Sequence, residues 1–316
     1  MEPVISILMP TYNHERFISQ AIESVLKQKT AYSFELLIND DCSTDNTGKI
    51  ASEYAIKYPD IIKYTRQNHN KGLLENYKFL LAHVKGRYLA ILESDDFWTD
   101  TEKLQKQIGF LEQNPDFGIC VGDYTTVDAN NNIIREFHKT DDEQLDGVWY
   151  GNILFTNFIC AATICFSKYF FKKYCDIDTY INNNFLTFDY PMLLDISANS
   201  KCFYIHENLS SYRVLSTSIS NTTDYDKNIK FEESVFQIQL YSISRWGTGN
   251  YTKEAVLEKR ISECLNKALN NRRFSDFIKY AKLLHSTTKK GKFIHTFPVI
   301  FYLQHIIRIH KPEGIS

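Results

Sequence analysis

The sequence has none of the glycine-rich motifs that bind nucleotide phosphates in many enzymes. Neither GxGxxG nor GxxxxGK followed by Ser or Thr occurs among its 316 residues. These absences argue against a dinucleotide-dependent oxidoreductase and against a P-loop kinase or ATPase. No stretch reaches the roughly 18–20 uninterrupted apolar residues of a transmembrane helix. The stretch that comes nearest, residues 293–309, is interrupted by His295, Pro298 and Arg308, among others.

Paired cysteines and a strong net charge are also missing. The seven cysteines are scattered, odd in number and without a CxxC pair, which argues against a zinc site and predicts reduced, mostly core thiols in a reducing compartment, the cytoplasm. A net charge of −2 gives no footprint for nucleic-acid binding. Residues 1–10 lack the basic start and the long apolar run of a signal peptide and predict a short strand. No sequence feature indicates an oligomeric state.

Apolar residues recur along the first hundred residues with alternating strand and helix periods. Short apolar runs predict strands at residues 4–9, 34–38, 61–65 and 88–92, and helical spacing predicts helices at 15–28, 45–58 and 74–83. This order predicts an α/β fold with a mostly parallel, twisted sheet, right-handed crossovers and helices on both faces.

The pattern loosens after residue 96. We expect helices at 102–113 and 191–199, strands at 118–124 and 160–167, and a hairpin turn at 128–132. From residue 228 only helical periodicity remains, at 229–245, 256–271 and 274–284. The chain therefore divides into an α/β domain, residues 1–225, and a helical C-terminal region, residues 226–316.

Polar and acidic residues follow each of the first four predicted strands. In open α/β sheets ligands bind beyond the carboxyl ends of the strands, so these four loops are the candidate ligand site. Ordinary polar loops with helix caps are the alternative. The residues concerned are Pro10, Thr11, Tyr12 and Asn13; Asp40 and Asp41; Asn70, Lys71 and Gly72; and Glu93, Ser94, Asp95 and Asp96.

The fourth loop carries the densest charge. Its carboxylates Glu93, Asp95 and Asp96 repel one another, and each raises the pKa of its neighbours unless a cation joins them. A hard divalent ion, Mg²⁺ or Mn²⁺, suits such oxygen ligands and would neutralise a diphosphate leaving group. The alternative is a solvated acidic cap on the helix that follows.

Five motifs in this order resemble the N-terminal half of family 2 glycosyltransferases, which have the GT-A fold. The resemblance spans residues 4–125, and a weaker one covers 188–190 and 211–220. The motifs are Pro10-Thr11-Tyr12-Asn13, Ala21-Ile22-Glu23-Ser24-Val25-Leu26-Lys27-Gln28, Asp40-Asp41 with Ser43-Thr44-Asp45-Asn46-Thr47, Asn70-Lys71-Gly72, and Ser94-Asp95-Asp96-Phe97-Trp98.

The resemblance implies a role for each of these loops. The Pro10–Asn13 turn and Asp40-Asp41 would hold the base and ribose of a nucleotide-sugar donor, with Tyr12 stacking on the base. The Asn70–Gly72 turn would close over the nucleoside and the sugar. Glu93 and Ser94 would face the donor, Asp95 and Asp96 would bind the metal, and Arg213 would lie near the donor phosphates. Asp189 would be the catalytic base, with the helical, solvated Asp195 as its rival.

The resemblance also implies the reaction: inverting transfer of a sugar from a nucleoside-diphosphate sugar, with a UDP-linked donor expected, to an acceptor hydroxyl in cell-surface polysaccharide or lipopolysaccharide synthesis. The acceptor would be a glycan or a lipid-linked glycan. The sequence departs from the family at Cys42, where Gly is common, at Glu93, where Asp is usual, and at Leu215, where His is frequent. These departures bear on the identity of the donor and on metal affinity.

Less specific interpretations stand beside these. Asp189 could simply cap a helix that has Pro191 in its first turn. His14 is read as a surface residue, and Trp98 as a core residue or a sugar-stacking one. The basic, aromatic segment from Arg272 fits either an anionic membrane surface or a packed helical subdomain. Two rival functions are a sugar-nucleotide nucleotidyltransferase and an inactive sugar-binding relative.

Overall fold

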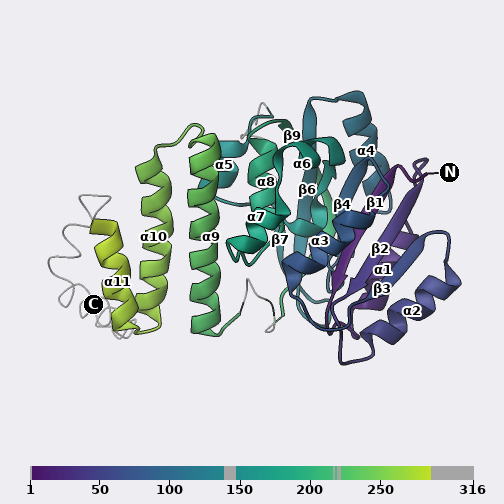
Figure 1. The fold of residues 1–316 in the computed structure, drawn as a ribbon, viewed down its shortest axis with the longest axis horizontal. Helices are drawn as coiled ribbons and strands as arrows, with labels where there is room; N and C mark the ends of the chain where they lie inside the picture. The colour runs from purple at the N-terminus through teal and green to yellow at the C-terminus, as the bar shows by residue number, and fades with distance from the viewer. Residues whose placement is uncertain (1, 139–146, 216–217, 219–221, 286–316) are drawn as a thin grey trace, which may run out of the picture. The chain divides into compact units, whose positions relative to one another are not determined.

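The computed structural model describes residues 2–138, 147–215, 218 and 222–285 (Figure 1). The chain forms two compact units, residues 1–216 and 217–316. The first unit is the α/β domain, and within the described residues it contains one sheet of nine strands. The second contains helices α9, α10 and α11. The expected division at residue 225 lies just inside the second unit, where α9 begins.

The first four strands are parallel, as the sequence predicts. Strand β1 (Ile5–Thr11) lies between β2 (Phe34–Asp40) and β4 (Tyr88–Ile91), and β3 (Ile62–Arg66) pairs with the far side of β2. In this register Thr11 lies opposite Asp40, and Leu8 lies opposite Ile91. The carboxyl ends of these strands therefore lie along the same edge of the sheet.

The rest of the sheet is mixed. The order continues from β4 through β8 (Cys165–Ser167), β6 (Phe117–Val127) and β9 (Lys201–Arg213) to the short β5 (Phe97–Trp98), and β7 (Ile133–Phe137) pairs with β6. Strands β6 and β9 are parallel, whereas β8, β5 and β7 are antiparallel to their neighbours. Because β8 is antiparallel to both β4 and β6, strand β6 and its parallel partner β9 run in the same direction as β4. The end of β9 therefore lies at the edge where β1 and β4 end.

Alternate residues of β1 explain how helices cover the sheet. Ile5, Ile7 and Met9 are buried in one cluster with helices α1 (Ile18–Leu26), α2 (Thr47–Lys57) and α4 (Lys103–Gln113). Side chains alternate between the faces of a strand, which leaves the opposite face for α3 (Leu73–His83), the helix that packs on β1 and β2.

Several short elements were not expected from the sequence. They are α5 (Tyr150–Phe155), the 3₁₀ turn Ala161–Thr163, α6 (Lys168–Tyr174) and α7 (Ile177–Asn182). The expected strand at 160–167 is only its last three residues, because the 3₁₀ turn occupies its first half. Helix α8 (Asp189–Ser197) begins two residues earlier than predicted. No disulfide joins any of the seven cysteines, all of which lie within the described residues, and most are buried, as expected.

The described part of the second unit is helical, as predicted. Helix α10 (Lys253–Asn270) packs against both α9 (Tyr225–Trp246) and α11 (Phe274–His285). Asp224 caps α9 and Thr252 caps α10, each accepting a hydrogen bond from a backbone N–H of the first turn.

Some of the basic residues of this unit have acidic partners on α9. Arg273 pairs with Asp226, and Lys279 pairs with Glu233. The rest of the basic segment, residues 286–316, lies outside the described residues. Among the helices that the structure does describe, none combines the length and the apolar character needed to cross a bilayer.

Candidate active site

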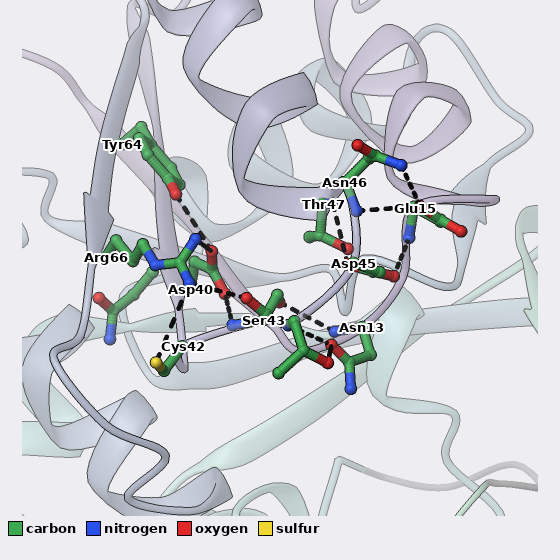
Figure 2. Close-up of polar contacts among 12 residues, drawn as sticks. Asn13, Glu15, Asp40, Cys42, Ser43, Asp45, Asn46, Thr47, Tyr64 and Arg66 are labelled. Carbon is green, nitrogen blue, oxygen red and sulfur yellow. Dashed lines mark hydrogen bonds and ion pairs between the residues drawn. The ribbon is translucent and has the colours of Figure 1, made fainter.

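The loops after β1 and β2 are joined by hydrogen bonds (Figure 2). The backbone N–H of Asn13 donates to Ser43 Oγ at 2.9 Å, and the Asn13 side-chain oxygen accepts from the backbone N–H of Thr44 at 2.8 Å. Glu15 Oε2 accepts from the backbone and side-chain nitrogens of Asn46, at 2.9 and 2.7 Å. The two predicted nucleotide-binding loops therefore form one rigid wall.

Asp40 lies beneath this wall and has no exposed surface. Its Oδ1 accepts from the backbone N–H of Ser43 at 2.8 Å, and its Oδ2 accepts from the Tyr64 hydroxyl at 3.1 Å, with Arg66 Nη1 3.8 Å away (Figure 2). The carboxylate therefore supports the loop from within the protein. Its expected contact with the nucleoside stays a prediction.

Asp41 holds the third loop. Its two oxygens accept from the backbone N–H groups of Lys71 and Gly72, each at 2.8 Å. The Asn70–Gly72 turn expected to close over the donor is therefore attached to the second loop. Tyr12 in the first loop is 41% exposed, so its ring is accessible for stacking on a base.

Cys42 adopts a left-handed backbone conformation, with φ of 63°. Only glycine adopts this conformation without steric cost. The conformation explains why a glycine would suit this position of the loop.

We call residues Glu93–Asp96 the acidic turn. Its first carboxylate, Glu93, accepts a hydrogen bond from the buried Tyr77 hydroxyl at 3.1 Å. Burial, together with the charges of Asp95 and Asp189, raises the pKa of Glu93 to about 8. Asp189, nearly one hundred residues further along the sequence, is therefore close enough to the acidic turn to affect its ionisation.

The end of β9 holds the other half of the acidic turn. The backbone N–H of Arg213 donates to Asp96 Oδ1 at 2.7 Å, and Arg213 Nε donates to the backbone oxygen of Asp95 at 2.8 Å. Asp96 is buried, and burial and the nearby charge of Asp95 raise its pKa well above the ordinary value. Arg213 is 1% exposed, with further bonds to Asp128, Asn131 and Gln20. Its expected contact with donor phosphates stays a prediction.

His14 is not the plain surface residue that the sequence suggested. Its Nδ1 lies 2.8 Å from Ser94 Oγ, and its Nε2 lies 3.8 Å from Asp95 Oδ2. Ser94 Oγ in turn donates to Thr11 Oγ1 at 2.6 Å. The acidic turn is thereby connected to the end of β1.

Asp189 is the first residue of α8 and not its N-cap. The capping position belongs to Phe188, whose side chain makes no cap bond. The Thr187 hydroxyl donates to Asp189 Oδ1 and orients the carboxylate. Burial raises the pKa of Asp189 above its ordinary value. Phe188 stacks on Tyr77 with ring centroids 4.1 Å apart, which fixes this segment against the residue that holds Glu93.

Two other expectations can be compared with the structure. Asp195 is fully buried and accepts a hydrogen bond from Tyr180 at 2.6 Å, so the interpretation as a solvated residue was wrong. The α8 helix turns it inward among apolar residues. Trp98 is 5% exposed and its indole N–H donates to the Ala162 carbonyl, which confirms the core role and not the sugar-stacking one.

The residues present fit a divalent ion only if a ligand completes its coordination. Among the described residues no group of three His, Cys, Asp or Glu side chains could hold a metal. Mg²⁺ and its relatives are commonly bound by one or two carboxylates together with substrate phosphates. The partly exposed Asp95 suits that arrangement, whereas one oxygen of Asp96 is already taken by Arg213.

The sequence of this α/β domain matches a known family. The family model described as "Glycosyl transferase family 2" matches residues 6–171, just over half of the chain. The chain belongs to glycosyl transferase family 2. The match covers the first three candidate loops and the acidic turn, and it stops short of Asp189 and Arg213.

Relatives with curated names match the same region. An uncharacterized protein of Mycobacterium tuberculosis is 39% identical over 116 residues, 37% of this chain and 34% of its own. The putative glycosyltransferase EpsE of Bacillus subtilis is 39% identical over 112 residues, 35% of this chain and 40% of its own. The Escherichia coli protein WfgD, named as a UDP-Glc:α-D-GlcNAc-diphosphoundecaprenol β-1,3-glucosyltransferase, is 37% identical over 134 residues, 42% of this chain and 50% of its own. The matches thus span a third to a half of these relatives' length.

Solved structures confirm the GT-A type of fold for this family 2 chain. TarS residues 1–349 from S. aureus, in complex with UDP-GlcNAc, superpose with a TM-score of 0.61 at 17% identity, covering 92% of this chain and 83% of that one. The mannosyltransferase PcManGT from Pyrobaculum calidifontis, in complex with GDP-Man and Mn²⁺, gives 0.54 at 14% identity, covering 98% and 87%.

Proposed function

We propose that this family 2 protein transfers a hexose or N-acetylhexosamine, with inversion, from a UDP-linked donor to an acceptor hydroxyl in cell-surface glycan synthesis. The observation that carries the proposal is the convergence of Asp189 with the acidic turn. Ser94 of the turn contacts His14 and Thr11 next to the nucleotide loops, and Asp189, from a different part of the chain, affects the ionisation of Glu93. Two carboxylate sites distant in sequence but close in space are what a single displacement needs.

The nucleotide half of the site is the wall formed by the first two loops. Tyr12 offers an exposed ring for the base, and the Asn70–Gly72 turn, held by Asp41, closes the other side. The donor diphosphate would then lie over the acidic turn, beside Asp95. A divalent ion held there by Asp95, with Asp96 behind it, would stabilise the negative charge of the departing nucleoside diphosphate.

The acceptor half of the site contains Asp189. An acceptor hydroxyl is a weak nucleophile until a proton acceptor lies within hydrogen-bond distance. Asp189 takes that proton while the hydroxyl oxygen bonds to the anomeric carbon and the nucleoside diphosphate departs from the opposite face. One base and one displacement give inversion. A pKa raised by burial makes the carboxylate a stronger base than a solvated one.

The relatives support the class of donor and acceptor. WfgD is named for a UDP-linked donor and a diphosphoundecaprenol-linked acceptor, and TarS is solved with UDP-GlcNAc. PcManGT is solved with GDP-Man, so a panel of donors is the right assay. Of the rival functions, a nucleotidyltransferase would need a glycine-rich loop after β1, where this chain has Pro10–Asn13. Retention of Asp95, Asp96 and Asp189 opposes an inactive relative.

Substitution of the base tests the proposal. Asp189→Asn should lower kcat by roughly 10²–10⁴-fold, the usual contribution of general-base catalysis. UDP affinity should stay within a factor of about two, because the base contacts the acceptor and not the nucleotide. In the wild type, activity should fall as the pH drops through the raised pKa of Asp189, since the protonated carboxyl cannot accept a proton.

The control is Asp178→Asn on α7, an exposed carboxylate whose ion pair with Lys78 contributes little in water. It should leave turnover unchanged. Near-normal turnover of Asp189→Asn, or a product that retains the donor's anomeric configuration, would show that Asp189 is not the base.

A further inference from the structure

His14 is held in place at both its backbone and its ring. Its N–H donates to Thr47 Oγ1 at 2.8 Å, and its ring meets that of Phe17 edge-on at 6.4 Å between centroids. Its Nδ1 lies 2.8 Å from Ser94 Oγ. These contacts aim Nε2 at Asp95.

The hydrogen bonds of Ser94 allow the tautomer that a metal ligand needs. Ser94 Oγ is fully buried and bonds to Thr11 Oγ1 at 2.6 Å and to His14 Nδ1 at 2.8 Å. When the Ser94 hydroxyl donates to Thr11, its oxygen accepts the Nδ1 proton of His14. The neutral ring then has a lone pair on Nε2, the nitrogen beside Asp95.

The distance between these two atoms has a chemical meaning. At 3.8 Å, Nε2 and Asp95 Oδ2 are too far apart for a hydrogen bond. Two atoms that bind one divalent ion at about 2.1 Å lie roughly 3 Å apart, so a small approach would let both bind the same ion. Both side chains are partly exposed, 24% for His14 and 16% for Asp95, so an ion and a ligand can reach them.

We propose that His14 Nε2 is a direct ligand of the divalent ion, together with Asp95. This inference rests on the proposed function, because donor phosphate oxygens complete the coordination. Imidazole nitrogen suits Mn²⁺ and later transition metals better than Mg²⁺, which prefers oxygen. An imidazole ligand from His14 would therefore favour Mn²⁺ over Mg²⁺ at this site. Ser94 is a positioning residue, since its hydroxyl holds Nδ1 and so fixes the orientation of the ring.

Pulsed electron paramagnetic resonance of Mn²⁺ bound to the full chain with UDP tests this directly. We expect the ¹⁴N coupling of a coordinated imidazole in the wild type and its loss in His14→Asn. The control His83→Asn removes an exposed histidine on α3, whose ring is bonded to the Phe79 carbonyl, and should keep the coupling. Absence of ¹⁴N coupling in the wild type, or its survival in His14→Asn, would overturn the inference.

Calorimetry gives a second measurement. His14→Asn should weaken Mn²⁺ binding in the presence of UDP at least about tenfold, since losing even an outer partner of a ligand costs 10–100-fold. Mg²⁺ binding should change little, and Ser94→Ala should show a smaller loss for Mn²⁺. Equal losses for both ions would contradict an imidazole ligand.

These outcomes separate the inference from the proposed function. If the wild type transfers sugar in EDTA and binds no Mn²⁺ with UDP, the ligand role of His14 is refuted and sugar transfer stands. If Mn²⁺ binds through His14 but no donor in the panel is consumed, the proposed function fails and the metal site stands.

Discussion

Gly48 in α2 lies against Asp40, the buried carboxylate that supports the nucleotide loops, and against its partners Tyr64 and Arg66. A Cβ at this position would lie 2.7 Å from Asp40 Oδ2, 2.8 Å from the Tyr64 hydroxyl and 3.0 Å from Arg66 Nη1. Asp40 cannot move away freely, because it is fully buried and both its oxygens have protein partners. We therefore expect Gly48→Ala to destabilise the protein, although alanine normally favours a helix.

The magnitude follows from the bond that must give way. Moving the Tyr64 hydroxyl away from Asp40 loses a hydrogen bond to a charged group, worth about 1.5–3 kcal/mol. The gain in helix propensity is at most about 1 kcal/mol, and less at the second residue of a helix than in its interior. The expected net loss is about 1–2 kcal/mol of unfolding free energy.

Gly109 in α4 provides a matched control. A Cβ there meets only the Tyr32 hydroxyl, at 3.8 Å, an ordinary van der Waals contact. Gly109→Ala should therefore stabilise the protein by about 0.5–1 kcal/mol, as alanine does in helix interiors. Urea unfolding of the two variants beside the wild type measures both signs.

The same pair of variants links stability to the site. Asp40 holds the Ser43 backbone, and Ser43 Oγ accepts from Asn13 in the first loop. Gly48→Ala should therefore also weaken UDP binding, whereas Gly109→Ala should not. A Gly48→Ala protein as stable as Gly109→Ala, with unchanged UDP affinity, would refute the view that this cluster supports the loops.

Three further predictions concern the loop, the ion and the C-terminal region. Cys42→Gly should stabilise the protein by about 0.5–1 kcal/mol in urea unfolding, because glycine relieves a left-handed strain of about 1–2 kcal/mol and loses part of that in chain entropy; Cys42→Ala, which keeps the strain, should not. UDP should bind at least about tenfold more weakly in EDTA than in Mn²⁺, since an ion on the diphosphate contributes several kcal/mol; Asp95→Ala should abolish that difference, and equal wild-type affinities would contradict it. The segment from residue 272 should bring the protein to anionic vesicles in a low-salt flotation assay, at about 1 kcal/mol per basic residue near the surface; failure to float would favour a purely packed helical subdomain.

The sequence was sufficient for the parts of the fold that depend on local patterns. Apolar runs placed the first four strands, and their βα order predicted parallel pairing with all four polar ends at one edge. The register of Thr11 opposite Asp40 follows from that topology. Short elements such as β5 and α7 could not be predicted, because two to six residues carry too little periodicity to outweigh their surroundings.

Partners distant in sequence could not be predicted from the residues themselves. The sequence did not indicate that the backbone and guanidinium of Arg213 hold Asp96 and the Asp95 carbonyl, which lie more than a hundred residues earlier in the chain. Lysines are almost never fully buried, but Lys103 is, with its ammonium bonded to Gln107 and lying over Trp98. Tertiary packing decides such positions, and no local signal records it.

The acidic turn brings these distant partners to one place. Each part of it is held from a different element: by Tyr77 of α3, by His14 after β1 and by Arg213 at the end of β9. Burying carboxylates and assembling them in this way costs free energy: burial first, and then the charge of Asp95, raise the pKa values of Glu93 and Asp96. That cost is useful if the carboxylates bind a cation that in turn stabilises a departing diphosphate, because groups already fixed in place need no reorganisation during the reaction. The hydrogen bonds around the turn therefore hold its mutually repelling carboxylates in place for a ligand that neutralises them.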